Sequence, residues 1–205
     1  MTTEGESFIR TPRARVVLAS ESPRRRELLR MIGIRFEAVV PRVKEELAGE
    51  MEPSAVVVEL ALKKALAAKD QFPDAVVIGA DTLVVLDGKV LGKPVDATEA
   101  YSMLRTLSGR THTVYTGTAL VDCPTGLCES GFERSLVTMR DLSDDEIARY
   151  IATGEPMDKA GGYGIQGFGG VFITHINGCY FNVMGLPIAR LYDQMDRLSK
   201  RLLRA

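Results

Sequence analysis

Hydroxyl and guanidinium groups meet in the segment LASESPRR at residues 18–25. An apolar run ends at Ser20, and Ser22 with the proline after it is typical of a helix start, the serine as N-cap and the proline at the first helical position. A helix N-terminus offers unpaired N–H groups and a partial positive charge, so this segment predicts a phosphate site. The alternative is a simple cap beside solvated arginines. Arg24 and Arg25 oppose the helix dipole unless an anion is present, which favours the phosphate hypothesis.

A carboxylate follows the apolar run AVVIGA, which we expect to be a strand ending at Asp81. Functional groups of α/β proteins often lie where strands end. Asp81 is therefore a candidate to hold a divalent cation or to act as a general base toward water, and the alternative is an aspartate that only forms a turn. Glu45 and Glu46, in the acidic loop before a long helix, are candidates for the same metal or members of a solvated charge run.

Three lysines and one glutamine are further candidates for binding an anionic ligand. Lys64 lies among leucine and alanine on a predicted helix, where a partly buried cation needs an anion. Lys93 and Lys159, like Lys64, are each also compatible with an ordinary surface position. Gln166 lies in the stretch 155–170, which has six glycines in sixteen residues. Such a backbone can approach a ligand closely and an amide can read a base edge, although a tight structural loop has the same composition.

Strand-like and helical segments are mixed without strict βαβ alternation, which predicts an α/β fold with a mixed central sheet and flanking helices. The predicted strands are 15–19, 36–41, 75–80, 83–86, 111–122 and 134–142, with a hairpin over 171–185 that turns at Asn177-Gly178. The predicted helices begin at Pro23, Ala55, Ala97, Ser143 and Leu186. Ser143 and Glu146 have the spacing of a capping box.

The composition is that of an ordinary globular protein, with 205 residues, 45% of them hydrophobic and 26% charged. We expect one domain over 14–205 after a loose polar extension over 1–13. The net charge of −1 argues against a nucleic-acid polymer or a membrane surface as partner. The first residues lack a signal-peptide pattern, so we expect a cytoplasmic protein. The three cysteines of the chain lack CxxC spacing, so we expect no structural zinc site.

Several separated motifs resemble those of the Maf family of nucleoside triphosphate pyrophosphatases. They are LASESPRR, the Lys64-Ala65 pair, GADT, LGKP, LSGRTHTVYTG, YIATGEPMDKAGGYGIQGFGG and INGCYFNVMGLP, and they occur in family order over roughly 15–197. The resemblance implies a two-lobed α/β fold around a cleft, related to the inosine triphosphate pyrophosphatases.

The resemblance also implies an activity and roles for individual residues. Members cleave the α–β phosphoanhydride of a nucleoside triphosphate, giving the monophosphate and pyrophosphate, with Mg²⁺ or Mn²⁺, and are commonly cytoplasmic homodimers. Asp81 is the expected proton acceptor, and Glu45 and Asp81 are expected to lie nearest the metal. Lys44 precedes Glu45 where many members carry a second acid, which is a departure from the family pattern. The residues expected to bind the triphosphate are Ser20, Ser22, Arg24, Arg25, Lys64, Lys93 and Lys159.

The segment DKAGGYGIQG resembles the corresponding segment of those family members that act mainly on dTTP and UTP. The resemblance therefore implies that branch of the family. The branch that prefers 7-methyl-GTP has Cys-Ala-Gly here and a glutamate near the glutamine position. On this basis Arg24, Thr82 and Gln166 are expected to set specificity. Modified pyrimidine nucleotides such as pseudo-UTP stay open as substrates, and the alternative function is a non-catalytic nucleotide-binding regulator of septum formation.

Overall fold

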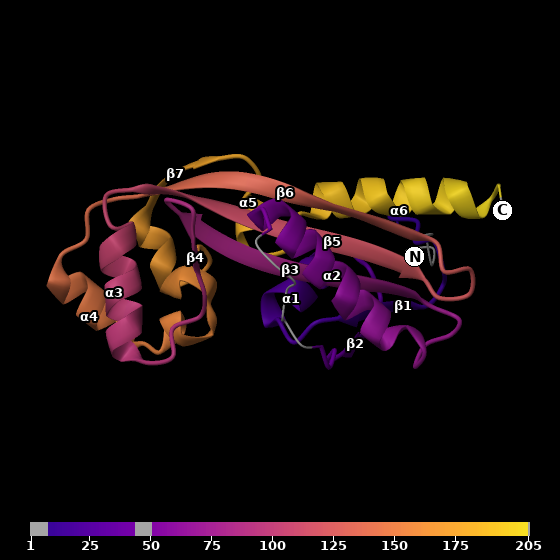
Figure 1. The fold of residues 1–205 in the computed structure, drawn as a ribbon, viewed down its shortest axis with the longest axis horizontal. Helices are drawn as coiled ribbons and strands as arrows, with labels where there is room; N and C mark the ends of the chain where they lie inside the picture. Colours follow the sequence, from indigo (N-terminus) through magenta and orange to yellow (C-terminus); the bar gives the residue numbers. More distant parts are fainter. Residues whose placement is uncertain (1–7, 44–50, 205) are drawn as a thin grey trace, which may run out of the picture.

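The computed structural model describes residues 8–43 and 51–204, and its centre is a seven-stranded mixed sheet (Figure 1). The strands are β1 (Val16–Ala19), β2 (Glu37–Val39), β3 (Val76–Leu86), β4 (Lys89–Leu91), β5 (Thr111–Asp122), β6 (Cys128–Met139) and β7 (Ile173–Asn177). Their order is β2-β1-β3-β5-β6-β7, with β4 paired to β3. The β1–β2 and β1–β3 pairs are parallel and the others are antiparallel, which confirms the predicted mixed sheet.

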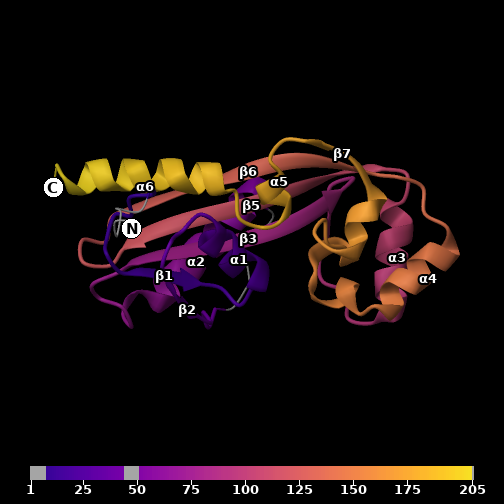
Figure 2. The ribbon, with the colours of Figure 1, turned by 180° about the vertical axis from the view of Figure 1, so that it is seen from behind.

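Helices cover this sheet in two groups, at opposite ends of the long strands β3, β5 and β6 (Figure 1, Figure 2). The helices are α1 (Pro23–Met31), α2 (Pro53–Lys69), α3 (Ala97–Leu107), α4 (Asp144–Ala152), α5 (Tyr180–Val183) and α6 (Ile188–Leu202). In the first lobe, α1 and α6 pack on one face of the sheet and α2 on the other, because alternate residues of β1 join two different core clusters. In the second lobe, α3 and α4 pack around a third cluster.

Two glycines let α2 lie directly on the sheet. A Cβ atom on Gly79 of β3 would overlap the carbonyl oxygen of Ala61 and lie 2.8 Å from the amide nitrogen of Ala65. A Cβ atom on Gly117 of β5 would overlap the carbonyl oxygen of Val57. The helix backbone therefore rests against the strand backbone, and the small side chains of α2 fill what space remains.

Strand β3 is continuous, whereas the sequence predicted two runs with Asp81 at the end of the first. Strand β5 pairs with β3 along its whole length, with Gly117 opposite Asp81, and this ladder carries the strand through the polar residues. The parallel neighbour β1 ends earlier, with Ala19 opposite Gly79. Asp81 therefore lies inside a strand, two residues past the end of β1.

The hairpin predicted over 171–185 is wrong in its second half. Strand β7 pairs with β6 as expected, but after Gly178 (φ 131°) the chain forms the short helix α5. Asn182 in α5 is fully buried and donates from Nδ2 to the carbonyl oxygen of Val114 and to Ser135 Oγ. These side-chain hydrogen bonds, made to strands distant in sequence, override the local turn signal.

Residues 8–13 also differ from the loose extension expected over 1–13. Ile9 is buried in the core of the first lobe. Arg13 donates to the carboxylate of Asp122, which is fully buried, at 2.6 and 3.0 Å. A buried carboxylate needs such a partner, so this part of the extension is held against the domain.

The glycine-rich stretch forms three short 3₁₀ turns rather than a long regular element, as expected. They are η1 (Glu155–Asp158), η2 (Ala160–Gly162) and η3 (Phe168–Phe172). Among all the helices of the described residues, none is long and apolar enough to cross a membrane.

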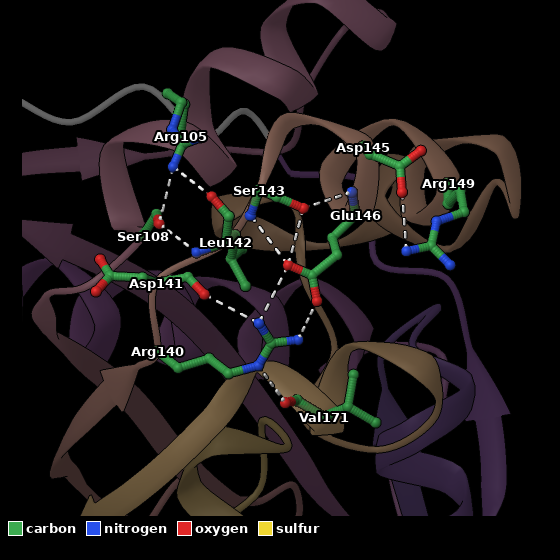
Figure 3. A network of polar contacts seen from close by, with 10 residues as sticks. All are labelled: Arg105, Ser108, Arg140, Asp141, Leu142, Ser143, Asp145, Glu146, Arg149 and Val171. Carbon is green, nitrogen blue, oxygen red and sulfur yellow. Dashed lines mark hydrogen bonds and ion pairs between the residues drawn. The ribbon is translucent and has the colours of Figure 1, made fainter.

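The N-terminus of α4 has the predicted capping box (Figure 3). Ser143 Oγ accepts from the Glu146 amide at 3.3 Å, and the Glu146 carboxylate accepts from the Ser143 amide at 2.9 Å. Arg140 donates to the same carboxylate at 2.6 and 3.2 Å. Hydrogen bonds from Arg140 and Ser143 lower the pKa of Glu146 to about 2.

We predict that Ser143→Ala lowers the free energy of unfolding by about 1 kcal/mol, the usual cost of a lost N-cap. Chemical denaturation at pH 7 measures this. Ser102→Ala is the matched control, because Ser102 Oγ donates to a carbonyl inside α3 and caps nothing. Its effect is expected to stay within about 0.5 kcal/mol. Equal effects of the two substitutions would contradict the capping role.

Candidate functional site

A cavity of about 670 Å³ lies between the two lobes. Its walls come from the β1–α1 junction, α2 and the middle of β3 on one side, and from the glycine-rich turns and the segment after β4 on the other. The predicted site residues that line it are Ser20, Ser22, Arg24, Arg25, Lys64, Asp81, Thr82, Lys93, Lys159 and Gln166. Glu45 and Glu46 lie outside the described residues. The structure thus brings together every predicted site residue that it describes, and their individual roles stay predictions.

Asp81 and Lys64 form an ion pair in the wall of this cavity. Lys64 Nζ donates to Asp81 Oδ1 at 2.6 Å, and each side chain is 12% exposed. The close contact of α2 with Gly79 brings this part of the helix next to β3. Lys64 comes directly before Ala65, whose amide faces that glycine. The ammonium group compensates the charge of a carboxylate that has lost most of its water. The ion pair therefore fixes the position of the Asp81 carboxylate in the cavity wall.

Arg25, which lines the cavity, links the residue after β1, the middle of β3 and the segment after α5. Its Nε donates to the carbonyl oxygen of Gly185 at 2.8 Å, and its Nη1 donates to Ser20 Oγ at 3.1 Å and to the carbonyl oxygen of Ala80 at 2.9 Å. Its Nη2 donates to Thr82 Oγ1 at 2.9 Å. These contacts position Ser20 and Thr82. The expectation that Arg25 also binds phosphate stays a prediction.

A chain of hydroxyl groups continues from Arg25 into the protein interior. Thr82 Oγ1 lies 3.0 Å from Thr116 Oγ1, and Thr116 donates to the carbonyl oxygen of Asn182 at 2.9 Å. Because the Thr116 hydrogen points to Asn182, Thr82 must donate to Thr116. Thr82 can therefore offer a ligand only an acceptor or its methyl group. Thr116 and Asn182 were not predicted from the sequence, because their types carry no local signal for this role.

Asp158 joins two of the predicted phosphate-binding cations at the mouth of the cavity. Arg24 Nη1 on α1 lies 3.3 Å from Asp158 Oδ2. Lys159 Nζ donates to Asp158 Oδ1 at 2.6 Å and to the carbonyl oxygen of Glu155 at 2.7 Å. The first of these pairs connects the first lobe with the second across the cavity.

Glu155 and Tyr150 hold the loop that carries Gln166. The Glu155 carboxylate accepts from Tyr150 Oη at 2.8 Å and from the amides of Phe168 and Gly169 at 3.0 and 3.1 Å. Tyr150 Oη accepts from the amide of Gly164 at 3.1 Å, and burial raises the pKa of this tyrosine. Sequence reasoning missed both residues, and an acid at the start of a glycine-rich stretch was the available signal.

A buried histidine supports the same loop from β5. His112 Nε2 lies 2.7 Å from the hydroxyl oxygen of Tyr163, which lines the cavity, and the two rings meet edge to face. Burial lowers the pKa of His112 to about 4. The imidazole is therefore neutral at physiological pH.

We predict that His112 destabilises the protein as the pH falls. Its pKa in the folded state is below the value of about 6.5 in the unfolded chain. The contribution of the neutral imidazole to folding stability is therefore complete above pH 6.5 and is lost between pH 6.5 and about 4. The expected loss is on the order of 3 kcal/mol over that window. Denaturation of wild type and His112→Asn across this range measures it. His175→Asn is the control, because His175 is exposed on β7 and should leave the wild-type slope unchanged. An equal slope in wild type and His112→Asn would contradict the assignment.

Asp81 supplies one carboxylate for a divalent cation, so most ligands of such a cation would have to come from elsewhere. In the described parts of the chain, no group of three or more His, Cys, Asp or Glu side chains could hold a metal. Mg²⁺ commonly binds through one or two carboxylates, the oxygens of substrate phosphates and water, and needs no preformed cage. The Asp81 carboxylate, which lines the cavity, would be one such ligand.

Comparison with known proteins adds independent information. A family model described as Maf-like protein matches residues 15–198. The dTTP/UTP pyrophosphatase of Pelotomaculum thermopropionicum is 48% identical over 92% of this chain and 98% of its own length. Those of Caldanaerobacter subterraneus and Carboxydothermus hydrogenoformans are each 50% identical, over 89% and 88% of this chain and 88% and 97% of their own lengths.

Proposed function

The chain belongs to the Maf family, and from this premise we propose that it hydrolyses dTTP and UTP to the nucleoside monophosphate and pyrophosphate. The observation that supports this most is one cavity in which the carboxylate Asp81 lies with the cations Arg24, Lys64, Lys93 and Lys159. Its volume of about 670 Å³ is within the usual range for small-molecule sites, roughly 300–1,000 Å³. Relatives named dTTP/UTP pyrophosphatase that are close to half identical support the same activity.

The proposed division of roles follows from the chemistry of phosphoanhydrides. Their cleavage needs little covalent assistance and depends on positioning and on neutralising charge. Arg24, Lys93 and Lys159 would bind phosphate oxygens, and the start of α1 would add the partial positive charge of a helix N-terminus. Asp81 would accept the proton of the attacking water. Lys64 would hold that carboxylate in place.

We propose that Asp81 and Glu45, with the triphosphate oxygens, hold Mg²⁺ or Mn²⁺. When bound, such a cation neutralises phosphate charge and makes water a better nucleophile. Gln166, Thr82 and Arg24 are proposed to choose the base. The glutamine amide pairs a donor with an acceptor, as the Watson–Crick edge of thymine or uracil requires. Because the family resemblance implies it, we also propose that the protein is a cytoplasmic homodimer. Analytical ultracentrifugation tests the dimer.

A substrate panel with separated products tests the function. It contains dTTP, UTP, pseudo-UTP, 5-methyl-UTP, dCTP and 7-methyl-GTP, each with Mg²⁺, with Mn²⁺ and with chelator. We expect the highest kcat/KM for the uracil and thymine nucleotides, and no turnover with chelator. Preference for 7-methyl-GTP would overturn the substrate assignment. Tight dTTP binding without product over a long incubation would favour the non-catalytic regulator.

A further inference from the structure

Asp158 is an anion placed among groups that suit the binding of anions. Its two carboxylate oxygens contact different cations, Arg24 at 3.3 Å and Lys159 at 2.6 Å, and all three side chains line the cavity. The cations come from opposite lobes, from α1 and from the glycine-rich turns. A carboxylate that bridges two such cations occupies their donors as a phosphate group would.

Lys159 has contacts besides Asp158 that hold its side chain. Its side chain is only 12% exposed, and its ammonium group also donates to the carbonyl oxygen of Glu155 at 2.7 Å. A Cβ atom on Gly164 would lie 2.7 Å from its Cε and 2.9 Å from its Cδ, so the aliphatic stem packs against the backbone of that glycine. A poorly hydrated, fixed ammonium group requires an anion, and Asp158 supplies it.

Asp158 itself is easier to displace. Its side chain is 57% exposed, so water can replace either partner. Burial raises the pKa of Asp158, but the hydrogen bond and charge of Lys159, together with the charge of Arg24, lower the pKa overall. The carboxylate is therefore ionised at neutral pH. Exposed ion pairs are weak, so a polyanion that brings several charges can exchange with it.

We propose that Asp158 competes with the polyphosphate of the substrate for Arg24 and Lys159. It is a positioning residue: it holds both cations at the cavity mouth, yields them to phosphate oxygens, and takes them back when pyrophosphate leaves. The proposal rests on the proposed function insofar as the substrate is a polyphosphate. It predicts that Asp158 weakens the binding of substrate and product and thereby prevents product inhibition.

The test compares binding of inorganic tripolyphosphate in the presence of chelator, by calorimetry, in wild type and Asp158→Asn. We expect affinity to rise about three- to tenfold, since the two ion pairs of the exposed Asp158 carboxylate no longer have to be broken. The melting temperature shows that each variant is folded. Asp158→Ser removes the same charge with a smaller side chain and must change affinity in the same direction. Asp145→Asn is the matched control, because Asp145 pairs with Arg149 on the exposed face of α4, and it should leave affinity unchanged.

A double substitution identifies the route of the effect. In the Lys159→Met background, Asp158→Asn should give a much smaller gain, because the contested cation is gone. With dTTP, Asp158→Asn should lower KM and the inhibition constant for pyrophosphate by similar factors, without raising kcat. If Asp158 had only a structural role, Asp158→Asn would lower kcat and the melting temperature and would leave KM and the inhibition constant for pyrophosphate unchanged.

Unchanged or weaker tripolyphosphate affinity in Asp158→Asn would overturn the proposal, as would failure of both proteins to bind. A gain that persists in full in the Lys159→Met background would overturn it as well. These results do not depend on turnover. If wild type cleaves no nucleotide, the proposed function fails and the binding comparison still decides the role of Asp158. If wild type releases pyrophosphate while Asp158→Asn binds no tighter, only this inference fails.

Discussion

Asp81→Asn is expected to reduce kcat for pyrophosphate release by about 10²- to 10⁴-fold, the usual contribution of a general base. Asparagine keeps the shape of the side chain, but its amide cannot take a proton from water. The substitution also leaves the ammonium group of Lys64 without the carboxylate that lies 2.6 Å away.

Steady-state kinetics with dTTP and UTP, together with the melting temperature, checks this prediction. Asp87→Asn is the matched control, because Asp87 lies just past the end of the same strand and pairs with exposed Arg110. It makes the same chemical change outside the cavity and should keep wild-type turnover. Full turnover by a folded Asp81→Asn protein would remove Asp81 from the proposed mechanism.

Gly79→Ala is expected to lower the free energy of unfolding by about 3 kcal/mol, in the upper part of the range for overpacking. The added methyl group would overlap the carbonyl oxygen of Ala61, and the obstacle is helix backbone rather than a side chain that can turn away. Relief requires α2 to move off the sheet. Because α2 carries Lys64, the shift would also separate Lys64 from Asp81, so activity should fall together with stability.

Chemical denaturation and steady-state kinetics on the same preparations measure the two effects. Gly92→Ala is the control for stability, since a Cβ atom there meets nothing within 4 Å. Its effect is expected to lie within about 0.5 kcal/mol. If Gly79→Ala unfolds with the wild-type free energy, the helix does not rest on the strand as closely as described.

Signals that span a few residues predicted local structure well. Ser22 caps α1 by accepting from the Arg25 amide at 3.4 Å, and Ser143 caps α4 in a capping box. Both depend on residues three apart in sequence, where side-chain type largely decides the geometry. The motifs also predicted which described residues line one cavity, since residues from the separated motifs meet there.

Contacts between distant segments could not be predicted in this way. The long ladder with β5 carries β3 through Asp81, although the polar residues there locally indicate a strand end. Arg25 is separated by 55 to 160 residues from three of the groups it contacts, and nothing near it in sequence indicates them. The same holds for Asp158, whose partner Arg24 is 134 residues away. The sequence therefore indicated which residues line the cavity. The structure adds which of these residues position the others through hydrogen bonds and ion pairs.

The products of dTTP hydrolysis test the central claim most directly. Wild-type protein, dTTP and Mg²⁺ are followed by ³¹P nuclear magnetic resonance from the first turnovers. We predict dTMP and pyrophosphate in equal amounts, with no orthophosphate formed alongside them. Release of orthophosphate with dTDP, or dTTP that stays intact while bound to the protein, would contradict the proposed hydrolysis.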